Sequence, residues 1–502
     1  MNAMANINSR QGMLLDTQTF FGIHNTFYQS LDNPFNDLSQ AIVQNGFSDY
    51  SKYGITSFFV FRYPILQYTM FEGFFRKVDF AKSPNNHLTF STRNLSLQKA
   101  VDIAEYLLLE SLDSKVGNAA RIGILLSGGL DSSLLVAMCK RIFPNRDIYT
   151  YSMGFYGDDE FEYSDEVAKL FSSKHSKQIL NADDYFGTNS LLPSLIKQKA
   201  APLHPNELPL AIAETKARKD CCDIILCGEG ADDVFGGYSH NLAMYLSYQN
   251  DKQSFFRHIL QEYRYFSMDK IRSLVHEKYL VDDCEMIAPL FEQDTLPHHL
   301  QDVMLYFIQM LHTRGLIERG MNALRYNGFA EGFVFLDSAL LTFVNSLPFD
   351  FKLHILQVEN AQKHISSLKG DYKAFSDSHC IAKFLLKEIA KSYLPESIIY
   401  RVKKGFPVPF ALWDKQSPIM PNLNAHIFKD NSLSTLNAWE KFMVYNLNTF
   451  INVFDSYRLR GGGQNSLIAC LIAFLFRSFL FLILFLSTLQ ILTHTILPKE
   501  RQ

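Results

Sequence analysis

A short apolar run that leads into a double-glycine turn constrains the fold of this chain most. Residues 122–127 read Ile-Gly-Ile-Leu-Leu-Ser, two glycines follow, and the next stretch, 132–143, has the composition of a helix. A second apolar run at 148–155 predicts another strand. Strand, helix and strand in this order predict a parallel βαβ unit, because parallel strands need a crossover connection.

The same alternation continues along the chain. We expect a helix over 160–174, a strand over 175–180, a helix over 210–219 and a strand over 222–228. The economical fold is α/β, with a doubly wound parallel sheet. After about Tyr238 the strand patterns fade and amphipathic helical patterns continue to about residue 460, which predicts a helical carboxyl-terminal half.

Three segments follow from these patterns: a small β-containing module over 1–94, a main domain over 95–460 and an apolar tail over 461–502. The module carries short β-type runs at 55–64 and 70–78 with turn-prone stretches between them. From Leu95 onward the apolar residues recur at helical spacing, which predicts the first helix of the main domain. This helix should end before Gly117.

Charge and cysteine usage exclude several classes of protein. The chain has 48 basic and 51 acidic side chains, a formal net charge of −3, so it has no basic excess for a nucleic-acid partner. Its seven cysteines are scattered without a Cys-x-x-Cys pair, which is typical of reduced thiols in the cytoplasm. The first residues lack the basic stretch and apolar run of a secretory signal.

The tail leaves membrane association open. Residues 466–489 carry one charge, Arg477, and a helix of about 20 residues can cross a bilayer. A carboxyl-terminal helix packed on the soluble body, or a frameshifted end, would give the same pattern. The expected location is therefore the cytoplasm, with or without attachment to a membrane through this tail.

The double-glycine turn has the composition of a phosphate-binding loop. Ser127-Gly128-Gly129-Leu130-Asp131-Ser132-Ser133 stands between a strand and a helix start, where unpaired backbone N–H groups attract anions. No Gly-Lys-Ser/Thr follows, so it is not a Walker A loop. It resembles the pyrophosphate loop (PP-loop) of the ATP pyrophosphatase superfamily, whose fold is the adenine nucleotide alpha hydrolase-like one. That resemblance implies cleavage of ATP between its α and β phosphates.

Two later segments narrow the resemblance. Residues 227–238, Cys-Gly-Glu-Gly-Ala-Asp-Asp-Val-Phe-Gly-Gly-Tyr, follow the last predicted strand, and Tyr400-Arg-Val-Lys-Lys-Gly-Phe-Pro-Val-Pro409 comes later. Both resemble motifs of the asparagine synthetase family, and the likeness covers about residues 95 to 415. It implies a ligase of amino-acid biosynthesis that binds ATP and Mg²⁺.

The resemblance assigns roles to residues one by one. Glu229 would support formation of the acyl-adenylate, and Lys403 would contact phosphate and the intermediate. Asp131 and Asp232 would bind Mg²⁺ against the triphosphate, since carboxylates from two strands can hold that ion. The ATP site would be lined by Leu126, Ser127, Gly128, Gly129, Asp131, Ser132, Ser133, Met153, Cys227 and Gly228.

The substrate is a small carboxylic acid, with aspartate as the first candidate. The family's Glu-x-Arg-x-Pro-Phe-Leu-Asp is here Ala330-Glu-Gly-Phe-Val-Phe-Leu-Asp337, without the Arg and the Pro, and Glu331 stands one position late. An amidotransferase or cyclase of natural-product or surface-polysaccharide synthesis, of the β-lactam synthetase or lasso-cyclase type, is the alternative enzyme. A nucleotide-binding protein that has lost catalysis is the alternative outside enzymes.

The nitrogen source is the remaining expectation. Glutamine-dependent members of the family begin with a cysteine, whereas this sequence begins Met1-Asn2-Ala3 and its first cysteine is Cys139. Residues 53–78 still resemble the last hairpins of the family's glutaminase domain. We therefore expect no glutaminase activity of its own, and ammonia, another amine or a separate glutaminase as the source of nitrogen.

Overall fold

The structure is a computed structural model of the chain. It describes residues 23–29, 34–78, 93–157, 160–240, 246–247, 251–291, 297, 299–356, 378–402, 405–429 and 433–459. All structural statements below concern these residues. The tail 466–489 and Lys403 lie outside them.

A four-stranded parallel sheet forms the centre of the main domain. Its order is β6-β5-β4-β7, with β4 (Arg121–Leu125), β5 (Asp147–Phe155), β6 (Lys174–Leu180) and β7 (Ile224–Leu226). Ile122 of β4 pairs with Ile148 on one side and with Ile224 on the other. The chain thus builds outward from β4 to β6 and returns to the opposite side of β4, which confirms the predicted doubly wound α/β fold.

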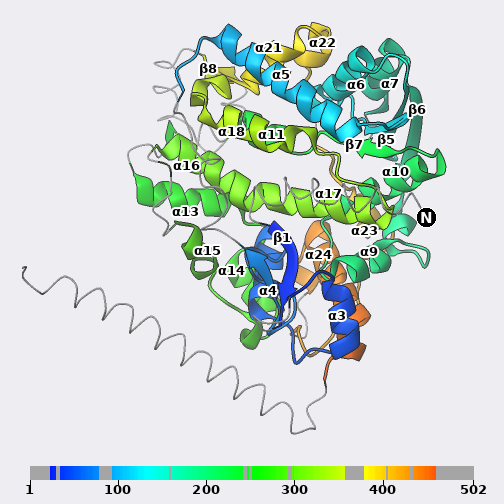
Figure 1. Ribbon diagram of the computed structural model, residues 1–502. Coiled ribbons are helices and arrows are strands. Elements are labelled where there is room, and N and C mark those ends of the chain that lie inside the picture. The colour runs from blue at the N-terminus through cyan, green and yellow to red at the C-terminus, as the bar shows by residue number, and fades with distance from the viewer. Residues whose placement is uncertain are drawn as a thin grey trace, which may run out of the picture.

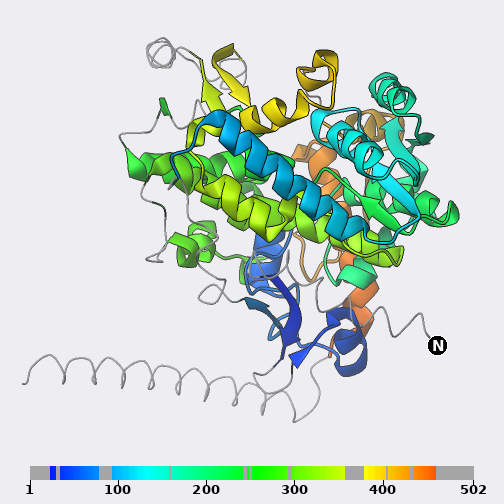
Figure 2. The same ribbon diagram turned by 45° about the horizontal axis from the view of Figure 1, so that its top comes forward.

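The crossover helices also lie where the sequence predicts them. They are α6 (Leu130–Ile142), α7 (Phe161–Leu170) and α10 (Glu207–Lys219), and α5 (Leu97–Val116) precedes the sheet. Ser96 caps α5 by accepting a hydrogen bond from the Lys99 amide, and the helix ends at Gly117, where φ is +52°. Figure 2 shows α5 crossing the molecule beside α18 (Ser338–Ser346), which it contacts.

The amino-terminal module contains β structure, as predicted, but one of its two predicted strands is a helix. It contains a small antiparallel sheet of order β2-β1-β3, from β1 (Ile23–Tyr28), β2 (Pro34–Phe35) and β3 (Phe75–Val78), with helices α3 (Leu38–Asn45) and α4 (Lys52–Phe61). The predicted strand over 55–64 is wrong, because most of that run forms α4. The strand predicted within 70–78 is present as β3.

Burial on all sides explains the error at α4. Ser51 caps this helix by accepting from the Gly54 amide at 3.2 Å, and every residue from Gly54 to Phe61 is buried. A short run that is buried on every side has no apolar periodicity that separates a helix from a strand. The module shares one hydrophobic cluster with the last helix, α24 (Ala438–Phe454), and Figure 1 shows the two ends of the described chain side by side.

The carboxyl-terminal half is mainly helical, as predicted. Its elements are α11 (Ala231–Phe235), α13 (Lys252–Tyr263), α14 (Met268–Leu274), η2 (Glu277–Tyr279), α15 (Asp283–Phe291), α16 (Leu300–Phe307), η3 (Ile308–Thr313), α17 (Arg314–Tyr326), η4 (Val334–Leu336), η5 (Phe349–Phe351), β8 (Leu353–Ile355), β9 (Cys380–Ala382), α21 (Phe384–Ala390), α22 (Glu396–Ile399), α23 (Phe410–Gln416), η6 (Leu433–Thr435) and η7 (Asp455–Tyr457). Short helices α8 (Ala182–Phe186) and α9 (Leu192–Lys199) lie between β6 and α10.

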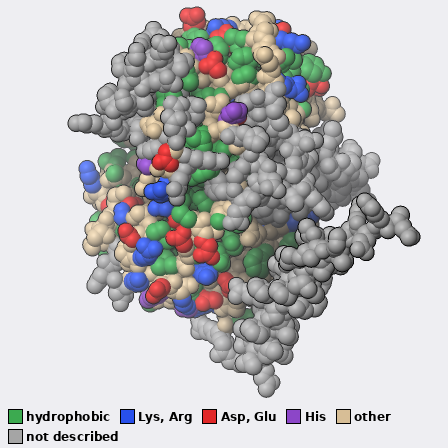
Figure 3. All heavy atoms as spheres, turned by 90° about the vertical axis from the view of Figure 1, so that its left-hand side faces the viewer, with side chains coloured by type: hydrophobic (Ala, Val, Ile, Leu, Met, Phe, Trp, Pro, Cys, Tyr) green, Lys and Arg blue, Asp and Glu red, His purple; other side chains and the backbone are tan. Residues whose placement is uncertain are grey.

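Two further observations concern the surface and the thiols. Acidic and basic side chains intermingle on the described part of the face in Figure 3. Within the described ranges, no helix is long and apolar enough to span a membrane. The six cysteines that the structure describes are free thiols.

Candidate active site

The glycine turn predicted to bind phosphate joins β4 to α6. The Ser127 amide donates to Ser132 Oγ at 3.2 Å, and the Gly129 amide donates to Ser127 Oγ at 3.3 Å. These hydrogen bonds join residues close together in the chain and fold the loop back over the first turn of α6. The helix begins after Gly129 without a side-chain cap. The uncapped helix start leaves backbone N–H groups directed out of the helix, as a phosphate site requires.

Gly128 is needed for this loop shape. Its φ is +70°, and a Cβ there would lie 2.6 Å from the carbonyl carbon of Tyr163. Both the backbone conformation and the close approach of α7 therefore exclude a side chain.

The second predicted loop meets the first at the carboxyl ends of neighbouring strands. It follows β7, and a Cβ on Gly228 would lie 3.0 Å from Cβ of Asp131. Glycine at this position lets the loops touch. β4 and β7 are adjacent in the sheet, so their carboxyl ends open into one crevice, as a doubly wound sheet provides.

One ammonium group joins the two predicted metal-binding carboxylates. Nζ of Lys383 lies 2.6 Å from Asp131 Oδ2 and 2.9 Å from Asp232 Oδ1. The lysine side chain is 8% exposed, and the two aspartates are 18% and 19% exposed. Burial alone would lower the pKa of Lys383, but the two carboxylates raise it above its usual value, so the group stays charged.

Sequence reasoning missed Lys383. It stands between β9 and α21 in the left-handed region, with φ of +54°, and is 252 residues from Asp131. Nothing in its local pattern separates it from a surface lysine. A non-glycine residue at positive φ is the signal that marks it, and only the structure provides that signal.

Glu229 lies beside this centre and has its own cation. Its Oε1 accepts from Nη2 of Arg319 on α17, and Nη1 of the same arginine lies 3.3 Å from His204 Nδ1. The side chains of Glu229 and Arg319 are 14% and 11% exposed. The predicted catalytic carboxylate is thus held by an ion pair that the sequence did not reveal.

Asp233, next to Asp232, is buried and titrates unusually. Burial, together with the negative charge of Asp232, raises its pKa to about 7. Tyr238 donates to it at 3.3 Å. A carboxyl group that can be neutral near pH 7 therefore adjoins the ion-paired one.

The remaining predicted ATP residues lie at the same edge of the sheet. Leu126 and Cys227 are buried directly after β4 and β7, and Met153 is half-buried near the end of β5. Burial raises the pKa of the Cys227 thiol, and the charge of Glu229 adds to this effect. Ser132 and Ser133 are buried in the first turn of α6.

The late loop predicted to carry Lys403 approaches the first loop. Arg401 donates to Glu160 at 2.7 Å, and its guanidinium lies 4.1 Å from the ring of Tyr163. A Cβ on Gly129 would lie 3.9 Å from Nη2 of Arg401. Phe406 packs on Phe155 at the end of β5, with ring centroids 5.0 Å apart.

Gly332, in the altered 330–337 segment, packs directly against the backbone of β7. A Cβ on Gly332 would lie 1.7 Å from the carbonyl oxygen of Ile225 in β7. The Cys227 amide donates to the Gly332 carbonyl at 3.4 Å, which adds this segment to the edge of β7. No side chain fits here, so the arginine of the family pattern has no counterpart at this position.

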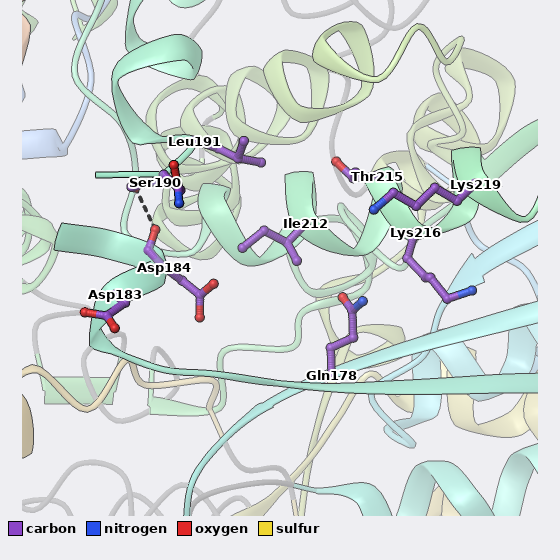
Figure 4. A pocket seen from close by; sticks show the side chains of 10 residues that line it. Gln178, Asp183, Asp184, Ser190, Leu191, Ile212, Thr215, Lys216 and Lys219 are labelled. Carbon is purple, nitrogen blue, oxygen red and sulfur yellow. Dashed lines mark hydrogen bonds between the residues drawn. The ribbon is translucent and has the colours of Figure 1, made fainter. Parts of the chain in front are cut away.

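A separate cavity lies away from these loops. It has a volume of about 320 Å³ and is lined by Gln178, Asp183, Asp184, Asn189, Ser190, Leu191, Ile212, Thr215, Lys216 and Lys219. Figure 4 shows the lysines of α10 on one side and the aspartates of α8 on the other, with Ser190 bonded to the Asp184 carbonyl at 2.6 Å. None of the predicted site residues lines it. The candidate site is therefore the crevice between the two loops.

Comparison with known proteins identifies the family of the chain. The sequence model of the family described as asparagine synthase matches residues 104–449, so the chain belongs to the asparagine synthase family. Glutamine-hydrolyzing asparagine synthetase 1 of Bacillus subtilis (strain 168) is 22% identical over 441 residues, which cover 81% of this chain and 67% of that protein. A putative glutamine-hydrolyzing asparagine synthetase 1 of Methanocaldococcus jannaschii is 21% identical over 318 residues, covering 62% of this chain and 49% of that protein.

Among solved structures, the comparison finds the NH3-dependent NAD synthetase from Campylobacter jejuni. It is 14% identical, with a TM-score of 0.22, over 44% of this chain and 96% of that chain. A U34-tRNA thiolase from Methanococcus maripaludis is 16% identical, with a TM-score of 0.24, over 49% of this chain and 85% of that chain. Family and fold class together define the chain as an ATP-dependent amide ligase by class.

Proposed function

We propose that this chain is an AMP- and pyrophosphate-forming amide ligase that activates a carboxylic acid by adenylation and transfers the acyl group to ammonia or an amine. The observation that carries the proposal is the meeting of Asp131 and Asp232 on Lys383, at the carboxyl ends of adjacent parallel strands. Two carboxylates and a fixed cation at an uncapped helix start are suited to a nucleotide triphosphate.

The donor set fits a magnesium ion. Asp131 and Asp232 supply the oxygen ligands that Mg²⁺ prefers, and a cation, the ammonium of Lys383, already lies between them. These two aspartates would hold the ion, which when bound neutralises charge on the phosphate oxygens. Lys383 would supply a second fixed positive charge beside the phosphates.

The chain's own groups then bind and orient ATP. The backbone N–H groups of Leu130, Asp131 and Ser132 in the first turn of α6 would bind phosphate oxygens, and Leu126, Met153, Cys227 and Gly228 would enclose the adenosine. Lys403 would contact the phosphate and the intermediate. The substrate carboxylate attacks the α-phosphorus, forming a P–O bond as the bond to pyrophosphate breaks. A neutral amine then attacks the acyl carbon, loses a proton and displaces AMP.

Glu229 is the group that we assign to the acyl-adenylate. Its ion pair with Arg319 fixes its direction, so it can accept a hydrogen bond from substrate without reorganising. Glutamate at this position favours transfer between two molecules over ring closure.

Aspartate is the first candidate acid, and a specific observation supports a second candidate function. Because Gly332 has no room for the arginine of the family pattern, the acid differs from aspartate if that arginine is essential for its recognition. An amidotransferase or cyclase of the β-lactam synthetase or lasso-cyclase type is then the better description. We propose that ammonia, another amine or a separate glutaminase supplies the nitrogen.

ATP–pyrophosphate exchange across candidate acids, aspartate first, tests the proposal. We expect exchange that needs Mg²⁺ and one acid, and that falls at least a hundredfold in Asp131→Asn and Asp232→Asn. Tight ATP binding without exchange for any acid would favour a nucleotide-binding protein without catalysis. Glutamate release from glutamine by the purified chain would contradict the proposed nitrogen source. Co-sedimentation with membranes, with and without 466–502, tests the tail.

A further inference from the structure

The cavity between β6, α8 and α10, called the α8–α10 cavity below, has no role in the steps above. Its volume of about 320 Å³ is within the usual range of sites for small molecules. Ile212, Thr215, Lys216 and Lys219 are spaced three and four residues apart on α10, so they share the helix face that lines the cavity. Gln178 of β6 and residues 183–191 complete the wall.

The positive pole of the cavity is Lys219. Figure 4 shows its ammonium pointing along α10 toward Ile212, whereas the ammonium of Lys216 points the other way. Lys216 pairs with Asp220 of its own helix turn. Lys219 is exposed and forms no ion pair with any residue that the structure describes. The charge of Lys219 is therefore available to an anionic group in the cavity.

The negative pole is Asp184 of α8. Figure 4 shows its carboxylate pointing toward α10, whereas the carboxylate of Asp183 points away. One oxygen of Asp184 accepts from the Asn181 amide at 2.8 Å, which fixes the direction of the group. Among the described residues Asp184 has no ion pair. A cationic group can bind here, whereas a simple anion would be attracted at one end of the cavity and repelled at the other.

An amide oxygen without a donor lies between the two poles. Gln178 projects from β6 into this space, and its Oε1 is buried without a hydrogen-bond partner in the part of the chain that the structure describes. The two hydroxyls that line the cavity are committed elsewhere. Ser190 donates to the Asp184 carbonyl at 2.6 Å. Thr215 donates to the Ala211 carbonyl at 2.8 Å. An N–H group of a bound molecule would satisfy this buried acceptor.

Apolar side chains separate the poles. Leu191 and Ile212 are half-buried in the cavity wall, and Figure 4 shows Ile212 between Asp184 and Lys219. Hydrocarbon on a ligand would gain free energy by covering them. The cavity thus offers partners for an ammonium, an N–H group, a carboxylate and an apolar side chain.

We propose that the α8–α10 cavity binds a dipeptide with free termini. Its ammonium pairs with Asp184, its carboxylate pairs with Lys219, and its peptide N–H donates to Gln178 Oε1. Hydrogen bonds between ionised groups at both ends supply the affinity. A single amino acid lacks the peptide N–H, and a simple anion or cation leaves one pole unpaired. None of the predicted site residues lines the cavity, so the dipeptide is a ligand and not a reactant, and the inference does not depend on the proposed function.

Calorimetry on the full chain with L-alanyl-L-leucine, in the absence of ATP, tests the site. We expect affinity to fall roughly tenfold when the amino terminus is acetylated or the carboxyl terminus is amidated, because each change removes one charge-assisted contact. L-leucine, without a peptide N–H, should also bind more weakly. Lys219→Met should weaken binding of the dipeptide by a similar factor. The same substitution should leave binding of the amidated dipeptide unchanged, because that ligand has no carboxylate for Lys219.

A converse variant and a control complete the experiment. Asp184→Asn keeps an acceptor for the Asn181 amide and removes the charge, so it should weaken binding of the dipeptide but not of its acetylated form. Lys197→Met, at an exposed lysine in the last turn of α9 outside the cavity wall, should behave as the wild type. Absence of binding at millimolar dipeptide, equal affinities for the free, acetylated and amidated peptides, or unchanged affinity in Lys219→Met would overturn the proposal. Displacement of the dipeptide by ATP would place it in the loop crevice and would overturn it as well.

Discussion

Removing the ammonium of Lys383 should leave two carboxylates facing each other, and the cost can be estimated. Asp131 and Asp232 lie 2.6 Å and 2.9 Å from Nζ. They are then roughly 5 Å apart, and two like charges at that distance repel by about 3 kcal/mol at an effective dielectric constant of about 20. Lys383→Met keeps an unbranched side chain that is one atom shorter and removes its charge.

The assay is thermal unfolding with and without Mg²⁺, in the absence of nucleotide. Without the ion we expect the Tm of Lys383→Met to fall by several degrees, since about 3 kcal/mol is a large fraction of a typical stability. Millimolar Mg²⁺ should recover much of this loss, because the ion can replace the ammonium, and should change the wild type less. Lys391→Met, at a 46% exposed lysine paired with Glu388, is the matched control.

The reasoning fails if Lys383→Met unfolds at the wild-type temperature without Mg²⁺. It also fails if Mg²⁺ raises both melting temperatures equally, because the two carboxylates would then not form the cation site. Either result would show that the ion-paired cluster of Lys383, Asp131 and Asp232 is not the proposed metal site.

Three other substitutions test the loops and the titrating group. Gly128→Ala should weaken ATP binding at least tenfold by calorimetry, because its φ is +70°, whereas Gly129→Ala, at φ of −80°, should bind nearly normally; equal affinities would contradict the loop argument. Asp233 has a folded pKa of about 7 against an ordinary 3.8. The folded protein therefore keeps a proton that the unfolded chain releases, and stability should fall by up to about 4 kcal/mol as the pH rises through this window. Asp233→Asn should flatten this decline in urea unfolding, and an unchanged slope would exclude this group. Gly332→Ala should lower the urea midpoint strongly, since its Cβ would lie 1.7 Å from a β7 carbonyl oxygen, while Gly405→Ala, with open space, should not; similar midpoints would refute the steric account.

Much of the site could be predicted from residues close together in the chain. The string Ser127–Ser133 and the loop at 227–238 each combine glycines and acids at fixed spacing, and parallel-strand topology brings such loops together. The alternating strands and helices between residues 95 and 228 were predicted for the same reason, since each element has a local apolar period.

Local pattern failed where burial is complete or partners are distant. Every residue of the run 55–61 is buried, so its sequence did not distinguish helix from strand, and packing against α14, η2 and α15 decided for the helix.

Lys383 and Arg319 have ordinary local sequences. Their roles come from ion pairs to Asp131 and Glu229, 252 and 90 residues away in the chain. The sequence determined which loops could bind a triphosphate, because glycine and acid spacing is a local property. Only the tertiary structure decided which cations lie against the carboxylates, because those contacts depend on how distant segments pack.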